Sequence, residues 1–169
     1  GSVDGRGVSK AAMGVRAGQA IAVDAQAAAQ VARGAVKLAA ALAHFGLDAS
    51  GRTALDIGAS TGGFTQTLLE RGSERVYAVD VGKGQLHATL TSDARVVSLE
   101  DCDARTLDHK LVPDAIGAIV VDVSFISLTK ALPAALALAV AGCWLVALVK
   151  PQFEVGRDGI GKGGVVRDE

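Results

Sequence analysis

The stretch of sequence that decides the fold runs from residue 55 to residue 65 and reads LDIGASTGGFT. It contains an apolar run, a glycine-rich turn and the start of a helical segment. Glycines let backbone amides approach a ligand closely, and a helix N-terminus favours electronegative groups. The spacing G-x-x-x-G-G matches neither the dinucleotide fingerprint G-x-G-x-x-G nor a P-loop. The stretch therefore predicts a strand, a turn and a helix, with a ligand site at the turn.

Apolar runs recur on both sides of this stretch, and they are continuous rather than alternating. Such runs are typical of strands that are covered on both faces, as in a parallel sheet. The predicted strands are residues 54–57, 76–80, 96–99, 118–122 and 145–149. The predicted helices between and before them are residues 30–45, 64–71, 84–90 and 128–141. Strands that alternate with helices predict an α/β doubly wound sheet.

The two ends of the chain differ from this pattern. Residues 3–8 and 18–23 have the composition of short strands joined by turns, and the opening Gly1-Ser2 resembles an expression scar. The helix over residues 30–45 is expected to stop at Gly46, a residue that commonly ends helices. Residues 153–169 are polar and glycine-rich, so they are predicted to form a loop.

Composition limits the class of protein. The 169 residues suffice for one domain with a real core. Seventeen basic and 18 acidic residues give a net charge of −1, so any nucleic-acid contact must come from a local patch. The basic candidates for contact with phosphate are Arg33, Lys37, Arg157, Lys162 and Arg167.

A mean hydropathy of +0.35 raises the question of a membrane segment. Residues 131–149 carry no charge and are long enough to span a bilayer, but Pro133 and Gly142 interrupt them. We interpret them as a buried helix followed by a buried strand. The chain does not open with a basic and then an apolar region, so the sequence predicts a cytoplasmic protein rather than a secreted one.

Cysteine and histidine spacing does not indicate a metal site. Cys102 and Cys143 lie 41 residues apart without a C-x-x-C motif, and the three histidines are scattered. We therefore expect no metal, no disulfide framework and no catalytic triad.

Charged side chains stand where the predicted strands end. Asp80 lies 22 residues after Gly58, where a carboxylate in such folds accepts hydrogen bonds from ribose hydroxyls. Glu100, Asp101 and Asp103 follow the third strand, where the edge of an adenine would lie, although taken alone they are better explained as solvated loop charges. Asp122 and Lys150 end two neighbouring strands and would face one crevice as an acid/base pair. Lys37, on the helix before the first strand, is the candidate for a second cation beside Lys150.

Six segments together resemble a known family, the TlyA-type haemolysin family of FtsJ-like methyltransferases. The similarity covers about residue 30 to the end of the chain. The segments that carry it are residues 31–38 (VARGAVKL), 55–65 (LDIGASTGGFT), 80–86 (DVGKGQL), 122–128 (DVSFISL), 148–156 (LVKPQFEVG) and 161–168 (GKGGVVRD).

The resemblance implies a Rossmann-like sheet that binds S-adenosylmethionine as methyl donor. The acceptor would be a ribose 2′-hydroxyl of ribosomal RNA, typically on cytidine, in free RNA or a ribosomal subunit. In this chain Gly58, Ser60, Gly62 and Gly63 of the glycine turn would hold the methionine end of the cofactor. Asp80 would hold its ribose and Asp103 its adenine. The full set of implied cofactor residues is Asp56, Gly58, Ala59, Ser60, Thr61, Gly62, Gly63, Phe64, Asp80, Val81, Asp103 and Asp122.

The family's catalytic set is Lys-Asp-Lys-Glu, and its first three members match Lys37, Asp122 and Lys150. By analogy Lys150 deprotonates or orients the 2′-hydroxyl, while Asp122 and Lys37 position it. The fourth member has no counterpart in this chain, and Glu169 is not assigned to that role.

The resemblance also implies a domain division. Residues 1–29 would be the scar, a remnant of an N-terminal S4-type RNA-binding domain and a linker. Residues 30–169 would be the methyltransferase domain, with its sheet truncated after the fifth strand.

Two other functions stay open at this point. A membrane-lytic haemolysin would need a span or a cationic amphipathic helix, and the sequence predicts neither, nor any stable membrane association. A methyltransferase-like module could also act on another substrate or be inactive.

Overall fold

The computed structural model describes residues 2–3, 6–7, 21–22, 26–155 and 166. Its main body is built on a sheet of five strands, all parallel, in the order β6-β5-β4-β7-β8. The strands are β4 (Thr53–Ile57), β5 (Arg75–Val79), β6 (Val96–Leu99), β7 (Ile116–Val121) and β8 (Ala139–Ala147). The predicted α/β fold with parallel strands is confirmed.

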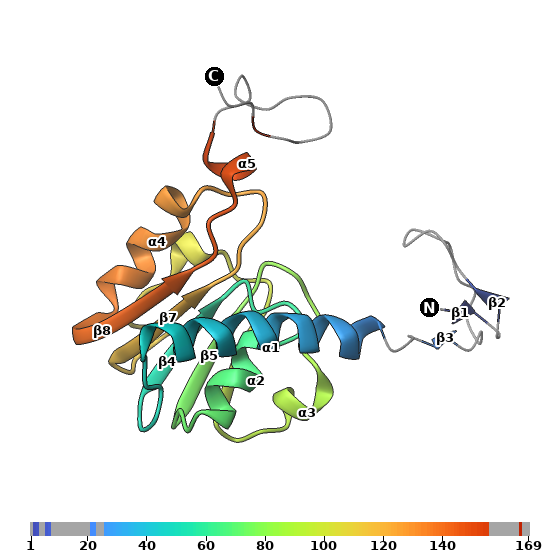
Figure 1. Ribbon diagram of the computed structural model, residues 1–169, viewed down its shortest axis with the longest axis horizontal. Helices are drawn as coiled ribbons and strands as arrows, with labels where there is room; N and C mark the ends of the chain where they lie inside the picture. The colour runs from blue at the N-terminus through green and yellow to red at the C-terminus, as the bar shows by residue number, and fades with distance from the viewer. Residues whose placement is uncertain (1, 4–5, 8–20, 23–25, 156–165, 167–169) are drawn as a thin grey trace.

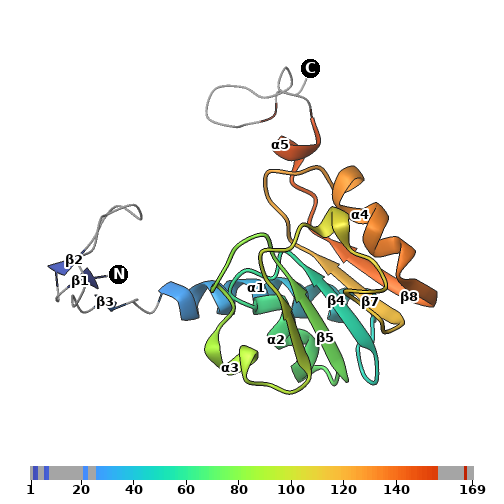
Figure 2. The same ribbon diagram turned by 180° about the vertical axis from the view of Figure 1, so that it is seen from behind.

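Helices cover both faces of the sheet, which explains why the strands are apolar throughout (Figures 1 and 2). One core cluster joins the sheet to α1 (Gln26–Phe45), α2 (Gly63–Glu70) and α3 (Ala88–Thr91). A second cluster lies on the other face, under η1 (Ala104–Thr106) and α4 (Leu128–Ala137). Along β4 the side chains alternate, so that Ala54 belongs to the first cluster and Leu55 and Ile57 to the second.

The first predicted helix stops where its sequence indicates. Helix α1 ends at Phe45, and Gly46 follows with a φ of 61°. A residue in this left-handed conformation commonly terminates a helix, and glycine adopts it without steric cost.

The predicted helix over residues 84–90 is largely wrong. Only α3 is helical there, and the preceding residues form a turn. The cause of this turn is Glu100, whose carboxylate accepts the backbone N–H groups of Gly84 (2.8 Å), Gln85 (2.8 Å) and Leu86 (3.1 Å). These amides bind a side chain from a neighbouring strand end, so they do not need helical carbonyl partners.

The boundary between the last predicted helix and strand also needs correction. Helix α4 ends at Ala137, and β8 begins at Ala139 rather than at residue 145. A continuous apolar run does not by itself distinguish a buried helix from a buried strand. Pairing of β8 with β7 decides the point, with an irregular register between Ile116 and Ala118. The predicted loop from residue 153 is wrong at its start, because α5 (Pro151–Glu154) is helical.

Near the N-terminus the structure describes three strands of two residues each. They are β1 (Ser2–Val3), β2 (Arg6–Gly7) and β3 (Ile21–Ala22), and they pair antiparallel in the order β2-β1-β3. The predicted strands over residues 3–8 and 18–23 overlap them. The assignment of residues 1–29 to an S4-type remnant stays a prediction.

Gly58 is required by close packing between two strand ends. Its φ is 83°, and a Cβ placed on it would lie 2.6 Å from the carbonyl oxygen of Asp122. Both the dihedral angle and the contact exclude a side chain unless the backbone moves.

We expect Gly58→Ala to destabilise the fold by about 3 kcal/mol, because it adds overlap with backbone to the cost of a positive φ. Gly46→Ala is the matched control, since its φ is 61° but nothing lies within 4 Å of a Cβ there. It should cost only about 1 kcal/mol. Urea denaturation of the two variants measures the difference, and equal losses would contradict the packing argument.

Candidate active site

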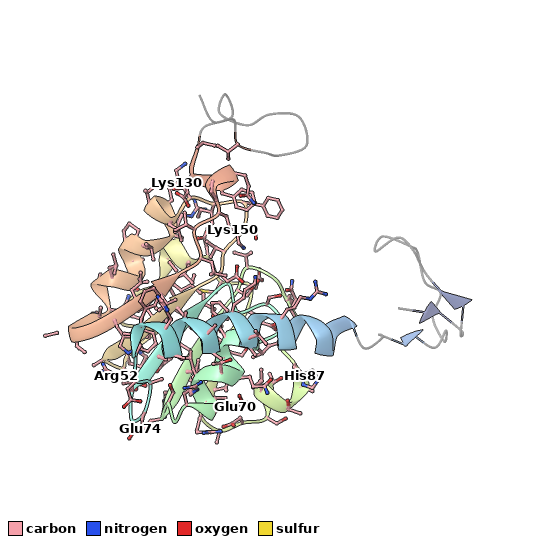
Figure 3. All side chains as sticks on the ribbon, viewed as in Figure 1. Arg52, Glu70, Glu74, His87, Lys130 and Lys150 are labelled. Atoms are coloured by element: carbon pink, nitrogen blue, oxygen red, sulfur yellow. The ribbon has the colours of Figure 1, made fainter. Side chains whose placement is uncertain are left out.

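The candidate site lies at the carboxyl ends of the parallel strands, where β4 and β7 are neighbours. The chain leaves β4 in one direction to α2 and β5, and it returns to β7 on the other side of β4. Open α/β sheets bind their ligands at such a switch point. Figure 3 shows Lys150 near α5 at this end of the strands, whereas Glu70 and Glu74 lie at the opposite end.

The glycine-rich turn after β4 is held by the end of β5. The backbone N–H groups of Gly58 and Ala59 donate to the Val79 carbonyl oxygen at 2.9 and 3.1 Å. Ser60, with a φ of 48°, donates its backbone N–H to Asp80 Oδ2 at 2.8 Å.

Asp80 connects this turn to the next one. Its Oδ1 accepts the backbone N–H of Gly82 at 2.7 Å, while its Oδ2 accepts that of Ser60. A carboxylate oxygen has two acceptor sites. Each oxygen of Asp80 therefore keeps the capacity to accept a hydrogen bond from a ligand.

The three predicted catalytic residues meet. Lys150 Nζ lies 2.6 Å from Asp122 Oδ1, and Lys37 Nζ lies 3.8 Å from Asp122 Oδ2. Lys150 Nζ also donates a hydrogen bond to Ser124 Oγ at 2.9 Å. The side chain of Lys37 is 54% exposed, against 25% for Lys150 and 23% for Asp122. Two cations thus face the two oxygens of one half-buried carboxylate.

Two clefts meet at this cluster. The smaller one, of about 330 Å³, lies between α1 and the glycine turn and is lined by Arg33 and Lys37. The larger one, of about 970 Å³, extends from Asp80 across the ends of β5 and β7 to α5. Gly58, Ser60 and Asp122 line both clefts. A long ligand could therefore occupy both clefts and pass beside the lysines.

Most of the predicted cofactor residues line one cleft or the other. The smaller cleft is lined by Gly58, Ala59, Ser60, Thr61, Gly63, Phe64 and Asp122. The larger is lined by Gly58, Ser60, Asp80, Val81, Asp103 and Asp122. Asp56 and Gly62 line neither of these two clefts. Asp56 is fully buried, and a Cβ on Gly62 would overlap the Leu90 side chain, so both act on the shape of the turn.

Asp103 is engaged with its neighbour on η1. Its carboxylate accepts hydrogen bonds from the Arg105 side chain and backbone, which lower the pKa of Asp103 to about 2. It is therefore charged at neutral pH. Both side chains line the larger cleft.

The sequence did not single out several residues of the site. Ser124 contacts Lys150, and Gln85 approaches Ser60 Oγ with its side-chain oxygen at 3.4 Å. Phe125 and Phe153 line the larger cleft, with ring centroids 5.1 Å apart. For Ser124 and Phe125 the sequence offers one signal of a place in the site, which is that they closely follow the end of a predicted strand. The role of Gln85 depends on how its loop folds.

No cluster of three or more potential ligands from His, Cys, Asp and Glu occurs within the described ranges. Cys102 and Cys143 are both free, and burial raises the pKa of each thiol. Of the helices in the described part of the chain, none combines the length and apolar character needed to cross a bilayer.

A family model for FtsJ-like methyltransferases matches residues 30–169. The chain belongs to the FtsJ-like methyltransferase family. The resemblance predicted from the six sequence segments is therefore confirmed.

The chain is similar to several curated proteins. The 16S/23S rRNA (cytidine-2′-O)-methyltransferase TlyA of Mycobacterium tuberculosis is 51% identical over 138 residues, which are 82% of this chain and 52% of that protein. Hemolysin A of Brachyspira hyodysenteriae is 45% identical over 140 residues, 82% of this chain and 58% of its own length. This FtsJ-like chain spans about half the length of the curated relatives it matches.

A solved structure supports the fold of this FtsJ-like chain. A candidate hemolysin of Streptococcus thermophilus superposes with a TM-score of 0.76 at 47% identity, covering 80% of this chain and 50% of that one.

Asp56 is a buried carboxyl group beneath the glycine turn. Its Oδ2 accepts the Thr65 hydroxyl at 2.7 Å, and its Oδ1 has no hydrogen-bond partner in the structure. Burial raises the pKa of Asp56 from 3.8 to about 7, against the opposing hydrogen bonds from Thr65. This side chain ties β4 to the first turn of α2.

Because the unfolded chain releases this proton near pH 4 and the folded chain near pH 7, stability falls between those values as pH rises. Asn cannot ionise, so Asp56→Asn removes this decline. Between pH 5 and pH 8 we expect the variant to gain roughly 2 to 3 kcal/mol relative to the wild type. Urea denaturation at both pH values measures the gain, and parallel pH dependences would contradict the assignment.

Proposed function

We propose that this protein transfers a methyl group from S-adenosylmethionine to the 2′-hydroxyl of a ribose in ribosomal RNA, on a cytidine. The observation that carries the proposal is the contact of Lys37, Asp122 and Lys150 at the point where two clefts meet. Membership of the FtsJ-like family and the activity named for the mycobacterial relative support it.

The residues of the site suit S-adenosylmethionine. The larger cleft offers volume for a nucleoside, and Asp80 has acceptor capacity for two ribose hydroxyls. We assign the methionine end to the glycine turn at Gly58 and Ser60, since both residues border the two clefts. Asp103 is assigned to the adenine, because it lines the larger cleft together with Asp80.

When bound, the cofactor supplies a methyl group on a positively charged sulfur. With the cofactor held by the glycine turn and Asp80, transfer of that methyl group to the ribose 2′-oxygen would leave the electron pair of the carbon–sulfur bond on sulfur and would release the hydroxyl proton. The chain's own residues align the hydroxyl and remove that proton.

Lys150 Nζ is the group we assign to the hydroxyl, because it is less exposed than Lys37 and fixed by two contacts. As an ammonium it donates a hydrogen bond and orients the 2′-oxygen, and as a neutral amine it accepts the proton. Asp122 holds Lys150 in place, and Lys37 balances the charge of Asp122 on its other oxygen.

RNA is the proposed acceptor, either alone or in a ribosomal subunit. Arg33 and Lys37 stand together on α1 at the smaller cleft, and Lys130 lines the larger one. The other predicted phosphate contacts, Arg157, Lys162 and Arg167, lie outside the described residues. A protein that modifies ribosomal RNA would work in the cytoplasm, which is the location we propose.

Calorimetric titration with S-adenosylmethionine tests the cofactor assignment. We expect saturable binding that weakens by about 10- to 100-fold in Asp80→Ala, because hydrogen bonds to a charged group are lost. Glu74→Ala is the matched carboxylate control, at the other end of the strands (Figure 3), and should bind like the wild type. Equal affinity in all three proteins would remove Asp80 from the site.

Transfer of labelled methyl groups to 16S and 23S ribosomal RNA tests the catalytic assignment. Lys150→Ala should lower the rate by roughly 10²- to 10⁴-fold, since the group that moves the proton is gone. Its affinity for S-adenosylmethionine should change by less than about 3-fold. Lys110→Ala, which removes an exposed lysine outside both clefts, is the control. A Lys150→Ala variant with an unchanged rate would contradict the role of Lys150.

A further inference from the structure

Two neighbouring segments carry Asp122 and Lys150 of the cluster, and they contact each other directly. The first segment, residues 122–128, joins β7 to α4 and contains Asp122. The second, residues 148–155, follows β8 and contains Lys150 and α5. One link between the segments is the cluster itself, in which Lys150 Nζ contacts Asp122 Oδ1 and Ser124 Oγ.

A second link is the pair of phenylalanine rings. Phe125 has a φ of 66° and a side chain that is 91% exposed. Phe153 on α5 packs against it, with the two ring planes tilted by 48°. Because Phe125 is almost fully exposed, its contact with Phe153 buries little apolar surface. This link therefore does not explain what fixes α5.

The third link is the carboxylate of Glu154, which is bound at both oxygens. Oε2 accepts the hydroxyl of Ser127 at 2.6 Å, and Oε1 accepts the backbone N–H of Leu128 at 2.9 Å. Ser127 and Leu128 form the N-terminus of α4, where backbone amides favour a negative charge. The hydrogen bonds from Ser127 and Leu128 lower the pKa of Glu154, so this carboxylate is charged at neutral pH.

Helix α5 is a single turn. It has four residues, and its internal bonds include Phe153 N–H to the Lys150 carbonyl at 2.8 Å and Val155 N–H to the Pro151 carbonyl at 3.1 Å. A helix of one turn is not stable by itself. Lys150 is the N-cap of α5, so the direction of its side chain follows the placement of that turn.

We propose that Glu154 is a positioning residue, which locks α5 onto the start of α4 and thereby holds Lys150 Nζ against Asp122. Glu154 makes no contact with Lys150 or Asp122 in the hydrogen bonds and ion pairs of the described residues. What Lys150 does chemically rests on the proposed function, whereas the placement of Lys150 by Glu154 is independent of it.

Competitive acetylation of lysines, followed by peptide mass spectrometry, measures the placement directly. Glu154→Ala should raise the acetylation rate of Lys150 by about 5-fold relative to Lys110 in the same molecule, because a loosened ammonium leaves its ion pair more often. Glu154→Gln should stay within about 2-fold of the wild type, since its Oε1 still accepts the Leu128 N–H and its amide can donate to Ser127 Oγ.

Glu70→Ala is the matched control, because the Glu70 carboxylate accepts only the Gln66 side chain on its own helix in the described structure. It should leave the Lys150 rate unchanged. If Glu154→Ala does not fold, Ser127→Ala removes one of the two anchoring contacts and should give a smaller rise. An unchanged Lys150 rate in a folded Glu154→Ala or Ser127→Ala protein would overturn the proposal.

Methyl transfer provides the second readout. Glu154→Ala should lower kcat by about 10- to 100-fold, the cost of a misplaced catalytic group. Glu154→Gln should restore most of it, with affinity for S-adenosylmethionine within about 2-fold in both variants. In a Lys150→Ala background, Glu154→Ala should cost nothing further, because it acts through Lys150.

The two readouts separate the two proposals. A wild-type protein without methyl transfer would refute the proposed function, while its acetylation pattern would still decide the role of Glu154. A rate loss that adds fully to that of Lys150→Ala would show that Glu154 does not act through Lys150.

Discussion

The site depends on how closely the chain after β4 passes the chain after β7. At Gly58 the gap to the Asp122 carbonyl leaves no room for a Cβ. Because the two strands run parallel and adjacent, the turn that opens toward α2 and the carboxylate that ends β7 come to one point. The two clefts share this point. A wider separation would take Asp122 away from the glycine turn and divide the site.

Charge at this point is arranged around Asp122. Its two oxygens face two ammonium groups, one from α1 and one from the end of β8. Directly beneath the turn, burial raises the pKa of Asp56 to about 7. Below that pH the Asp56 carboxyl group is mostly protonated, so it adds little negative charge to the site. The Asp80 carboxylate accepts backbone N–H groups from two turns, and each of its oxygens can still accept a hydrogen bond from a ligand. Each carboxyl group of the site thus has a different environment and a different task.

Carboxylates also shape the loops around the site. Glu100 binds three consecutive amides after β5, and Glu154 binds the start of α4. In both places a carboxylate distant in sequence accepts backbone N–H groups, Glu100 from the end of β6 and Glu154 from α5. These hydrogen bonds connect the loops that line the larger cleft, and we propose that they hold Lys150 in place as well.

The sequence by itself determined the α/β class, the strand–turn–helix at residues 55–65 and the meeting of Lys37, Asp122 and Lys150. The class and the turn follow from apolar periodicity, and the meeting of Asp122 with Lys150 follows from the rule that parallel strands end at one edge. Lys37 lies on the preceding helix, and its place in the cluster follows from the family resemblance. Only the tertiary structure decided the turn at residues 84–87, the early start of β8 and the contacts of Ser124 and Glu154. Each of these depends on a partner distant in sequence. Helix propensity and apolar runs report a residue's own neighbourhood, whereas a hydrogen bond from Glu100 or a strand pairing to β7 exists only after the chain has folded.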